Sequence, residues 1–276
     1  MHILGLSFFY HDSAAALLGD GMLLAAAQEE RFSRIKHDHG FPSKAAAFCL
    51  EQAGIEAGDL DYVVFYEKPM VKFERILLSS MATFPRSWGS FREAMANWFG
   101  EKLWVKSVIA RELGVPSDRI LFTDHHDAHA ASALFCSPFE EAALLTIDGV
   151  GEWTTTAMGT GRAGWSEGSS SSIRLETEHR FPHSIGLLYS AFTAFLGFRV
   201  NNGEYKVMGM APYGTPEFVD AIYEKILRVN PSDGSFRLNL DYFSYHHSPD
   251  RSFSGRFTEL FGPPRVPESP FQTVMT

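Results

Sequence analysis

Residues 3–28 read ILGLSFFYHDSAAALLGDGMLLAAAQ, and their pattern sets the fold class. The stretch contains three apolar runs of strand length, at residues 3–9, 14–18 and 22–28. Between the second and third runs, Gly19-Asp20-Gly21 is typical of a hairpin turn, because glycine tolerates a positive φ. The residues between the first and second runs, Tyr10-His11-Asp12-Ser13, predict a polar loop. The chain is therefore expected to open with three antiparallel strands.

A charged loop, a helix and another strand are expected next. Residues 29–38 are densely charged and predict a loop. A helix is expected at 43–53, with Ser43 as its cap. Residues 61–66 contain Val63, Val64 and Phe65 and predict a buried strand. Together with the opening strands, this order predicts a mixed α/β sheet.

Residues 67–113 predict amphipathic helices, interrupted near Pro85 and Gly89. The segment is rich in Phe and Trp. It is either an insertion that covers a site or contacts a partner, or a plain helical layer. Its aromatic part, residues 84–104, suggests an interface such as that of a homodimer.

The second half of the chain repeats the opening pattern. Strands are expected at 143–147, 153–159 and 173–179, a turn at Gly159-Thr160-Gly161, and a helix at 184–198. Both copies end in a similar peptide, Glu30-Arg31-Phe32-Ser33 in the first and His179-Arg180-Phe181-Pro182 in the second. The sequence therefore predicts an internal duplication, with a first subdomain at 1–138 that carries a helical insertion at about 70–113 and a second at 139–276.

The duplicated plan resembles the actin-like, ribonuclease-H-like ATPase superfamily, an α/β fold with a duplicated ββαβα-type architecture. In that superfamily the first turn of each hairpin holds nucleotide phosphate. Such a turn presents several backbone N–H groups to an anion. The matching turns here are residues 8–13 and 148–152. Their predicted phosphate-binding residues are Asp12, Ser13, Gly149 and Gly151.

A candidate metal site lies in the run DHHDAH at residues 124–129. Asp124 can cap the helix that follows, on which His125 and His129 are four residues apart and share one face. Asp148, at the end of the next strand, can add a carboxylate. Two imidazoles and one carboxylate suit Fe(II), Zn(II) or a similar divalent ion. The alternative is a chance pair of surface histidines.

Composition excludes some classes of function. The chain has 276 residues, 45% of them hydrophobic, and a formal net charge of -9, so a general nucleic-acid-binding role is not expected. No apolar run is long enough to span a bilayer, and no signal peptide is recognisable. Cys49 and Cys136 lie in apolar runs and are expected to be buried, reduced thiols. A cytoplasmic protein is therefore expected.

Five motifs appear in order along the chain: Tyr10–Ala15, Glu29–Asp38, Asp124–Ala133, Asp148-Gly149 and Asn202–Gly214. Together they resemble the O-carbamoyltransferase family that modifies nodulation factors, aminoglycosides and cephalosporins. The resemblance covers nearly the whole chain, to about Pro270. A more distant relative is the enzyme that makes threonylcarbamoyladenosine on tRNA, which shares the His-x-x-x-His pair.

The resemblance implies a divalent metal on His125, His129 and Asp148, with Fe2+ favoured and Zn2+ or Mn2+ as alternatives. It also implies ATP and a carbamoyl adenylate made from carbamoyl phosphate, and a hydroxyl of a small-molecule natural product as acceptor. The predicted sites therefore lie on the two turns and on the helix between them.

The same resemblance implies that His11 is the base for the acceptor hydroxyl and that Lys36 lies near the transferred group. The alternatives from sequence alone are a surface or capping histidine for His11 and a solvated lysine for Lys36. Glu204 and Lys206 lie in a motif that lines the same cleft and are expected among the cofactor-binding residues, with no specific role assigned to either.

Family members are much longer than this chain, and the final residues 272–276 do not read as a domain end. The chain is therefore expected to be an N-terminal fragment with an incomplete second half. One alternative function is a non-catalytic metal- or nucleotide-binding fragment that needs a partner chain. Another is a sugar-kinase-like phosphotransferase. A hydrolytic His-Glu-x-x-His metalloenzyme is disfavoured, because His126 follows His125.

Overall fold

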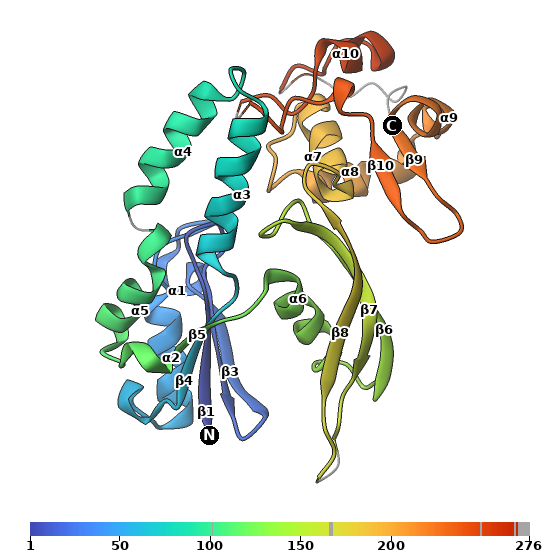
Figure 1. Ribbon diagram of the computed structural model, residues 1–276. Helices are drawn as coiled ribbons and strands as arrows, with labels where there is room; N and C mark the ends of the chain where they lie inside the picture. The colour runs from blue at the N-terminus through green and yellow to red at the C-terminus, as the bar shows by residue number, and fades with distance from the viewer. Residues whose placement is uncertain (101, 166–167, 249, 268, 270–276) are drawn as a thin grey trace. The chain divides into compact units, whose positions relative to one another are not determined.

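The computed structural model describes residues 1–276 except 101, 166–167, 249, 268 and 270–276 (Figure 1). The terminal residues 272–276, on which the expected truncation rests, lie outside the described residues. The chain divides into two compact units. Unit 1 comprises Met1–Glu74 and Ala94–Ala128, and unit 2 comprises Arg75–Glu93 and His129–Thr276. The predicted subdomain limits, 1–138 and 139–276, stay predictions.

Unit 1 is built on a five-stranded sheet with the order β3-β2-β1-β4-β5. β1 pairs antiparallel with β2 on one side and parallel with β4 on the other, and β5 extends the parallel part. This mixed sheet with its helices is the α/β, ribonuclease-H-like class expected from the sequence. The strands are β1 (His2–Ser7), β2 (Ala14–Gly19), β3 (Met22–Gln28), β4 (Tyr62–Phe65) and β5 (Ile120–Phe122).

The hairpin turn between β2 and β3 is confirmed and consists of two residues. Gly19 pairs with Met22, so Asp20 and Gly21 form the turn. Their φ angles are 49° and 83°. Two successive positive φ angles are characteristic of the type I′ turn, whose twist matches that of the flanking strands.

The predicted helix at 43–53 is α2 (Ser43–Ala53), but the prediction that Ser43 caps it is wrong. Pro42 holds the cap position and has no side chain that accepts a hydrogen bond. The buried carboxylate of Glu29 accepts instead from the amides of Lys44 and Ala45, at 3.3 and 2.8 Å. The charged stretch before α2 also contains one helical turn, α1 (Glu30–Ser33), where a loop was expected.

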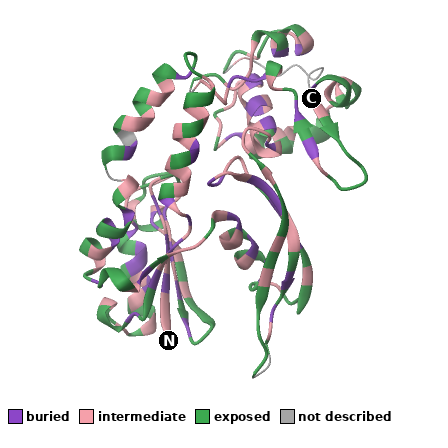
Figure 2. Ribbon diagram, viewed as in Figure 1, coloured by how far each residue is buried: buried purple, intermediate pink, exposed green. Residues whose placement is uncertain are grey.

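The core of unit 1 includes buried residues of its sheet, which are coloured purple in Figure 2. Alternate residues of β1, beginning with Leu4 and Leu6, are buried there, as are Val63 and Phe65 of β4. Burying a side chain of this size contributes about 1.5–3 kcal/mol. Cys49 of α2 joins this core as predicted.

The segment between β4 and β5 is helical, as predicted. Its helices are α3 (Pro69–Ala82), α4 (Trp88–Gly100) and α5 (Val105–Leu113). Pro85 lies in the break between α3 and α4. Proline interrupts a helix because it lacks a backbone donor and its ring clashes with the preceding turn. Phe84, Trp88, Phe99 and Trp104 are each more than half exposed.

Unit 2 contains a second antiparallel sheet of three strands, β6 (Glu141–Ile147), β7 (Thr154–Arg162) and β8 (Ser172–Arg180). This sheet repeats the β1-β2-β3 arrangement, so the duplicated opening is confirmed. No parallel strand is found in the described part of unit 2. β6 therefore pairs only with β7 within that part.

The predicted turn at Gly159-Thr160-Gly161 is wrong, because these residues lie inside β7. The two glycines are required by close packing instead. A Cβ atom on Gly159 would lie 1.9 Å from the carbonyl oxygen of Arg174. A Cβ on Gly161 would lie 2.5 Å from a methyl carbon of Leu134.

The predicted helix after β8 is α7 (Ile185–Phe195), capped by Ser184, whose Oγ accepts from the amide of Leu187 at 2.9 Å. An aromatic cluster that includes Phe192, Phe195 and Phe257 joins α7 to the end of the described chain. Cys136 is exposed, so its predicted burial is wrong, and both cysteines are free thiols. The remaining elements are α8 (Glu204–Met210), α9 (Val219–Ala221), β9 (Leu227–Val229), β10 (Phe236–Leu238) and α10 (Gly255–Phe261).

No helix within the described residues is both long and apolar enough to cross a membrane.

Candidate metal centre and the loops that flank it

The metal site predicted from the sequence lies on α6 (His125–Leu134), which follows β5 directly. The carbonyl of Asp124 accepts from the amide of Ala128, so Asp124 occupies the position before the helix, as predicted. The partner that its carboxylate has in the structure is Lys68, which donates to it at 2.7 Å. The helix therefore starts immediately at His125.

α6 is one continuous helix, so His125 and His129 are held in a common frame one turn apart. The Nε2 atom of His129 lies 3.6 Å from Oδ2 of Asp148. One ligand atom from each of His125, His129 and Asp148 lies within 4.8 Å of the other two. Ligands at about 2.1 Å from a first-row ion are about 3–4 Å apart, so small side-chain rotations would close the set around one ion.

Asp148 is fixed by the loop that follows β6. Its Oδ1 accepts from the amide of Gly149 at 2.6 Å, and its own amide donates to Thr155 at 2.9 Å. The hydroxyl of Ser184 donates to the carbonyls of Asp148 and Gly149 at 3.1 and 2.6 Å. A Cβ on Gly186 would lie 2.4 Å from the Asp148 carbonyl, so glycine is needed there. The start of α7 thus holds this carboxylate in place.

Several amides of the two predicted phosphate loops already have hydrogen-bond partners within the chain. In the first loop, Phe9 donates to His39 and Ser13 donates to Asp38, both at 2.8 Å. In the second, Gly149 donates to the Asp148 carboxylate and Gly151 donates to Thr154. A phosphate bound at these positions would have to use the remaining amides or displace these bonds. Phosphate binding by Asp12, Ser13, Gly149 and Gly151 stays a prediction.

His11 is held by a carboxylate in the first loop. Its Nδ1 lies 2.8 Å from Oδ2 of Asp12, whose Oδ1 lies 3.0 Å from Nδ1 of His37. Burial acts to raise the pKa of Asp12, but the hydrogen bonds from His37 and His11 outweigh it and the pKa is lowered. Asp12 therefore orients two imidazoles, which leaves the Nε2 atom of His11 as the nitrogen that can accept a proton.

The three other predicted residues lie apart from these contacts. Lys36 is exposed and directly precedes His37. Lys206 is exposed, with its ammonium 5.9 Å from the ring centre of Phe198. Glu204 accepts from the Ser190 hydroxyl at 3.1 Å and from the Asn201 amide at 3.0 Å, contacts that join α8 to α7. Cofactor binding by Glu204 and Lys206 stays a prediction.

The sequence did not indicate Glu67, which is buried beside His125. Oε2 of Glu67 lies 3.4 Å from Nδ1 of His125, and Lys72 donates to both carboxylate oxygens at 3.0 and 2.9 Å. Burial acts to raise the pKa of Glu67, yet His125 and Lys72 lower it overall. The one sequence signal for Glu67 is its position two residues after the strand Tyr62–Phe65, next to Tyr66.

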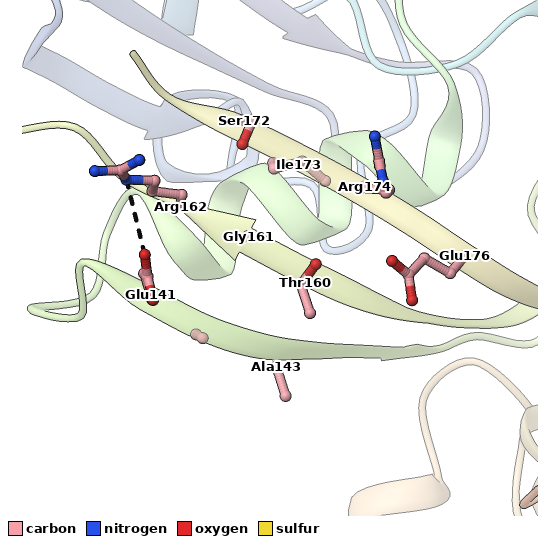
Figure 3. A pocket seen from close by; sticks show the side chains of 10 residues that line it. Glu141, Ala143, Thr160, Gly161, Arg162, Ser172, Ile173, Arg174 and Glu176 are labelled. Atoms are coloured by element: carbon pink, nitrogen blue, oxygen red, sulfur yellow. Dashed lines mark ion pairs between the residues drawn. The ribbon is translucent and has the colours of Figure 1, made fainter. Parts of the chain in front are cut away.

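A surface hollow of about 720 Å³ lies on the sheet of unit 2, at the end where β7 leads into β8 (Figure 3). Glu141 and Arg162 form an ion pair on its wall, with 3.8 Å between Arg162 Nε and Glu141 Oε1. None of the site residues predicted from the sequence lines it. The hollow therefore has no part in the candidate metal centre.

Two longer proteins are similar to this chain in sequence. It is 50% identical over 277 residues to the uncharacterized protein sll1178 of Synechocystis, an alignment that covers 98% of this chain and 44% of that protein. It is 34% identical over 240 residues to the nodulation protein NolNO of Sinorhizobium fredii, covering 84% of this chain and 32% of that protein. The chain thus spans less than half the length of these two relatives.

Among solved structures, the chain is similar to YeaZ from Pseudomonas aeruginosa, with 16% identity, a TM-score of 0.35 and 66% of each chain covered. A family model described as "Carbamoyltransferase N-terminus" matches residues 2–271. The matched range includes both loops and the whole of α6. A match over nearly the full chain shows the family, and this chain belongs to the carbamoyltransferase N-terminus family.

Proposed function

We propose that this chain takes part in carbamoyl transfer from carbamoyl phosphate, through a carbamoyl adenylate, to a hydroxyl group of a small-molecule natural product. The observation that carries the proposal is the family match over residues 2–271. The cluster of His125, His129 and Asp148 adds a donor set that suits a divalent metal ion. Because the chain spans less than half of its longer relatives, the full reaction requires residues beyond it.

In this proposal His125, His129 and Asp148 hold the metal, with Fe2+ favoured and Zn2+ or Mn2+ as alternatives. Two neutral imidazoles and one carboxylate leave coordination positions open for another ligand. The bound ion would supply Lewis-acid polarisation of a phosphate or carbonyl oxygen.

The protein's own acid–base chemistry centres on His11. Its Nδ1 faces Asp12, so Nε2 accepts the proton of the acceptor hydroxyl. The acceptor oxygen then forms a bond to the carbamoyl carbon, and the bond from that carbon to the phosphate oxygen of AMP breaks. AMP leaves with the electron pair, and Lys36 offsets negative charge that develops near the transferred group.

A partner-dependent role is the second candidate, favoured by the coverage of the relatives. In that case this chain contributes the metal centre and the loop of His11 but carries out no transfer by itself. Preformed carbamoyl adenylate distinguishes the two, because the first candidate predicts carbamoylated product from this chain alone and the second only in a mixture with a complementing C-terminal chain.

Elemental analysis of the purified chain tests the metal centre. We expect close to one equivalent of a divalent metal in the natural chain and its loss in His129→Ala. His39→Ala changes an exposed histidine outside the cluster and serves as the matched control. Equal metal content in all three proteins would refute the ligand set. Calorimetry with carbamoyl phosphate and with ATP then tests substrate binding separately from the metal.

A further inference from the structure

Glu67 is a buried acid that no part of the proposed chemistry uses. It lies two residues after the end of β4, and its side chain is 7% exposed. A carboxylate taken out of water at this depth needs charged partners or hydrogen bonds. Two side chains of unit 1 supply them, His125 and Lys72.

The contact with His125 involves one ring nitrogen. Oε2 of Glu67 lies 3.4 Å from Nδ1 of His125, and the imidazole is only 11% exposed. The ring of Tyr66 packs edge-on against the imidazole, with 5.4 Å between ring centres. An ionised carboxylate only accepts hydrogen bonds, so its charge favours the proton on the nitrogen that faces it. The other nitrogen, Nε2, then keeps its lone pair.

Lys72 holds Glu67 in position and ionised. Its ammonium donates to both carboxylate oxygens, at 3.0 and 2.9 Å, and the lysine side chain is 13% exposed. The same ammonium lies 4.9 Å from the ring centre of Tyr10, in the first loop. Glu67 therefore contacts both Lys72 and His125 and links the two side chains.

We propose that Glu67 is a positioning residue that fixes His125 as the Nδ1–H tautomer and presents its Nε2 lone pair as a metal ligand atom. A carboxylate that holds the second nitrogen of a ligating imidazole fixes the ring's orientation and raises its basicity. The part that concerns the metal rests on the proposed function. The contacts that favour this tautomer, those of Glu67 with His125 and Lys72, lie within unit 1.

The tautomer is measured first, on the metal-free full chain at a pH of about 8, where an ordinary imidazole is neutral. Long-range ¹H–¹⁵N spectra distinguish a protonated ring nitrogen from an unprotonated one. We expect His125 of the natural chain to carry its proton on Nδ1. A proton on Nε2 of His125 in that chain would overturn the proposal.

Two variants separate positioning from folding. Glu67→Gln keeps the shape and one acceptor oxygen, so the Nδ1–H tautomer should persist. The double variant with Glu67→Leu and Lys72→Met removes both buried charges together, which avoids an unpaired charge in the interior. In this variant the Nδ1–H signal of His125 should shift or be replaced by the other tautomer. An unchanged His125 spectrum in the folded double variant would contradict the proposal.

Metal affinity is the second readout, measured by titration of the natural chain and the variants with Zn²⁺ and with Fe²⁺ under anaerobic conditions. Loss of such a partner lowers affinity roughly 10–100-fold, so the double variant should fall in that range and Glu67→Gln should fall less. Affinity equal to that of the natural chain in the double variant would refute the metal-related part. An Nδ1–H tautomer in a chain that binds neither ion would support the role of Glu67 and refute the proposed metal centre.

Discussion

Unit 1 contains two histidine–carboxylate arrangements that share their chemistry and differ in burial. Asp12 contacts His11 and His37 in an open loop, where the three side chains are 31%, 43% and 27% exposed. Glu67 contacts His125 and Lys72 beneath the surface, where exposure is 7–13%. In each case a carboxylate faces the Nδ1 atom of an imidazole. Burial therefore decides how strongly each arrangement is coupled to the stability of the fold.

Solvent determines the energetic difference between the two. Exposed ion pairs are typically worth about 0–1 kcal/mol, because water screens them and the side chains lose freedom. Removing one partner of a buried pair costs about 3–5 kcal/mol, because the remaining charge is left without compensation. The open Asp12 arrangement should thus affect chemistry more than stability, and the buried Glu67 arrangement should affect both.

The largest effect is expected for Lys72→Met, which removes the ammonium that donates to both oxygens of Glu67. The free energy of unfolding should fall by about 3–5 kcal/mol, because a buried carboxylate loses its closest positive charge. Chemical denaturation monitored by circular dichroism measures this change.

Lys68→Met is the matched control for that variant. Lys68 also bonds a carboxylate of unit 1, Asp124, but the two side chains are 40% and 51% exposed. Its loss should cost less than about 1 kcal/mol. Equal stability of the two lysine variants would contradict the idea that burial determines how much each lysine–carboxylate pair contributes to stability.

Asp12→Asn should have an intermediate effect, on rate rather than on stability. The amide can present its NH₂ group to His11 and favour the wrong tautomer, so the base would lose its acceptor nitrogen. On the proposed function, carbamoyl transfer should slow by roughly 10²-fold, with stability changed by less than about 1 kcal/mol. Product formation in a complemented reaction, measured beside thermal unfolding, checks both. A large loss of stability with an unchanged rate of carbamoyl transfer would show that Asp12 acts on the fold and not on the chemistry.

The smallest effect concerns acid stability. The pKa of Asp12 is lowered in the folded chain, since His37 and His11 outweigh the opposing effect of burial. A lowered carboxyl pKa contributes stability above the unfolded pKa of about 3.9, and this contribution is lost as the pH falls through the folded pKa. Between about pH 5 and 3 the natural chain should therefore lose slightly more stability than Asp12→Asn. Parallel slopes in acid titrations of unfolding would argue against the lowered pKa.

The opening strands, their turn and the helices could be predicted from sequence because each depends on local pattern. Apolar runs of strand length and an Asp-Gly turn specify β2 and β3 with few alternatives. The spacing of His125 and His129 follows from helical geometry alone. The contact between Glu67 and His125 could not be predicted, because it arises only when β4 and β5 pair in parallel and bring two distant segments together.

Two of the wrong predictions, the cap at Ser43 and the turn at Gly159-Thr160-Gly161, have related physical causes. Ser43 was expected to cap α2, but the buried carboxylate of Glu29 accepts hydrogen bonds from the helix amides instead. Folding of the sheet brings Glu29 next to the start of α2. Gly159 was expected in a turn, but it lies within β7 where the backbone of Arg174 approaches closely. In both cases the role of the residue is set by tertiary packing, whereas its local sequence pattern indicates a different role.

The strand β6 bears on how this chain would behave when produced alone. Within the described residues it pairs on one side only, and its Leu145 and Ile147 are 61% and 53% exposed. Its counterpart β1 is paired along both sides. An edge strand with unpaired backbone donors and acceptors and exposed apolar side chains can pair with strands of neighbouring molecules. If the purified chain aggregates and Leu145→Lys reduces this aggregation, the association occurs through the exposed edge strand and not through a native dimer interface.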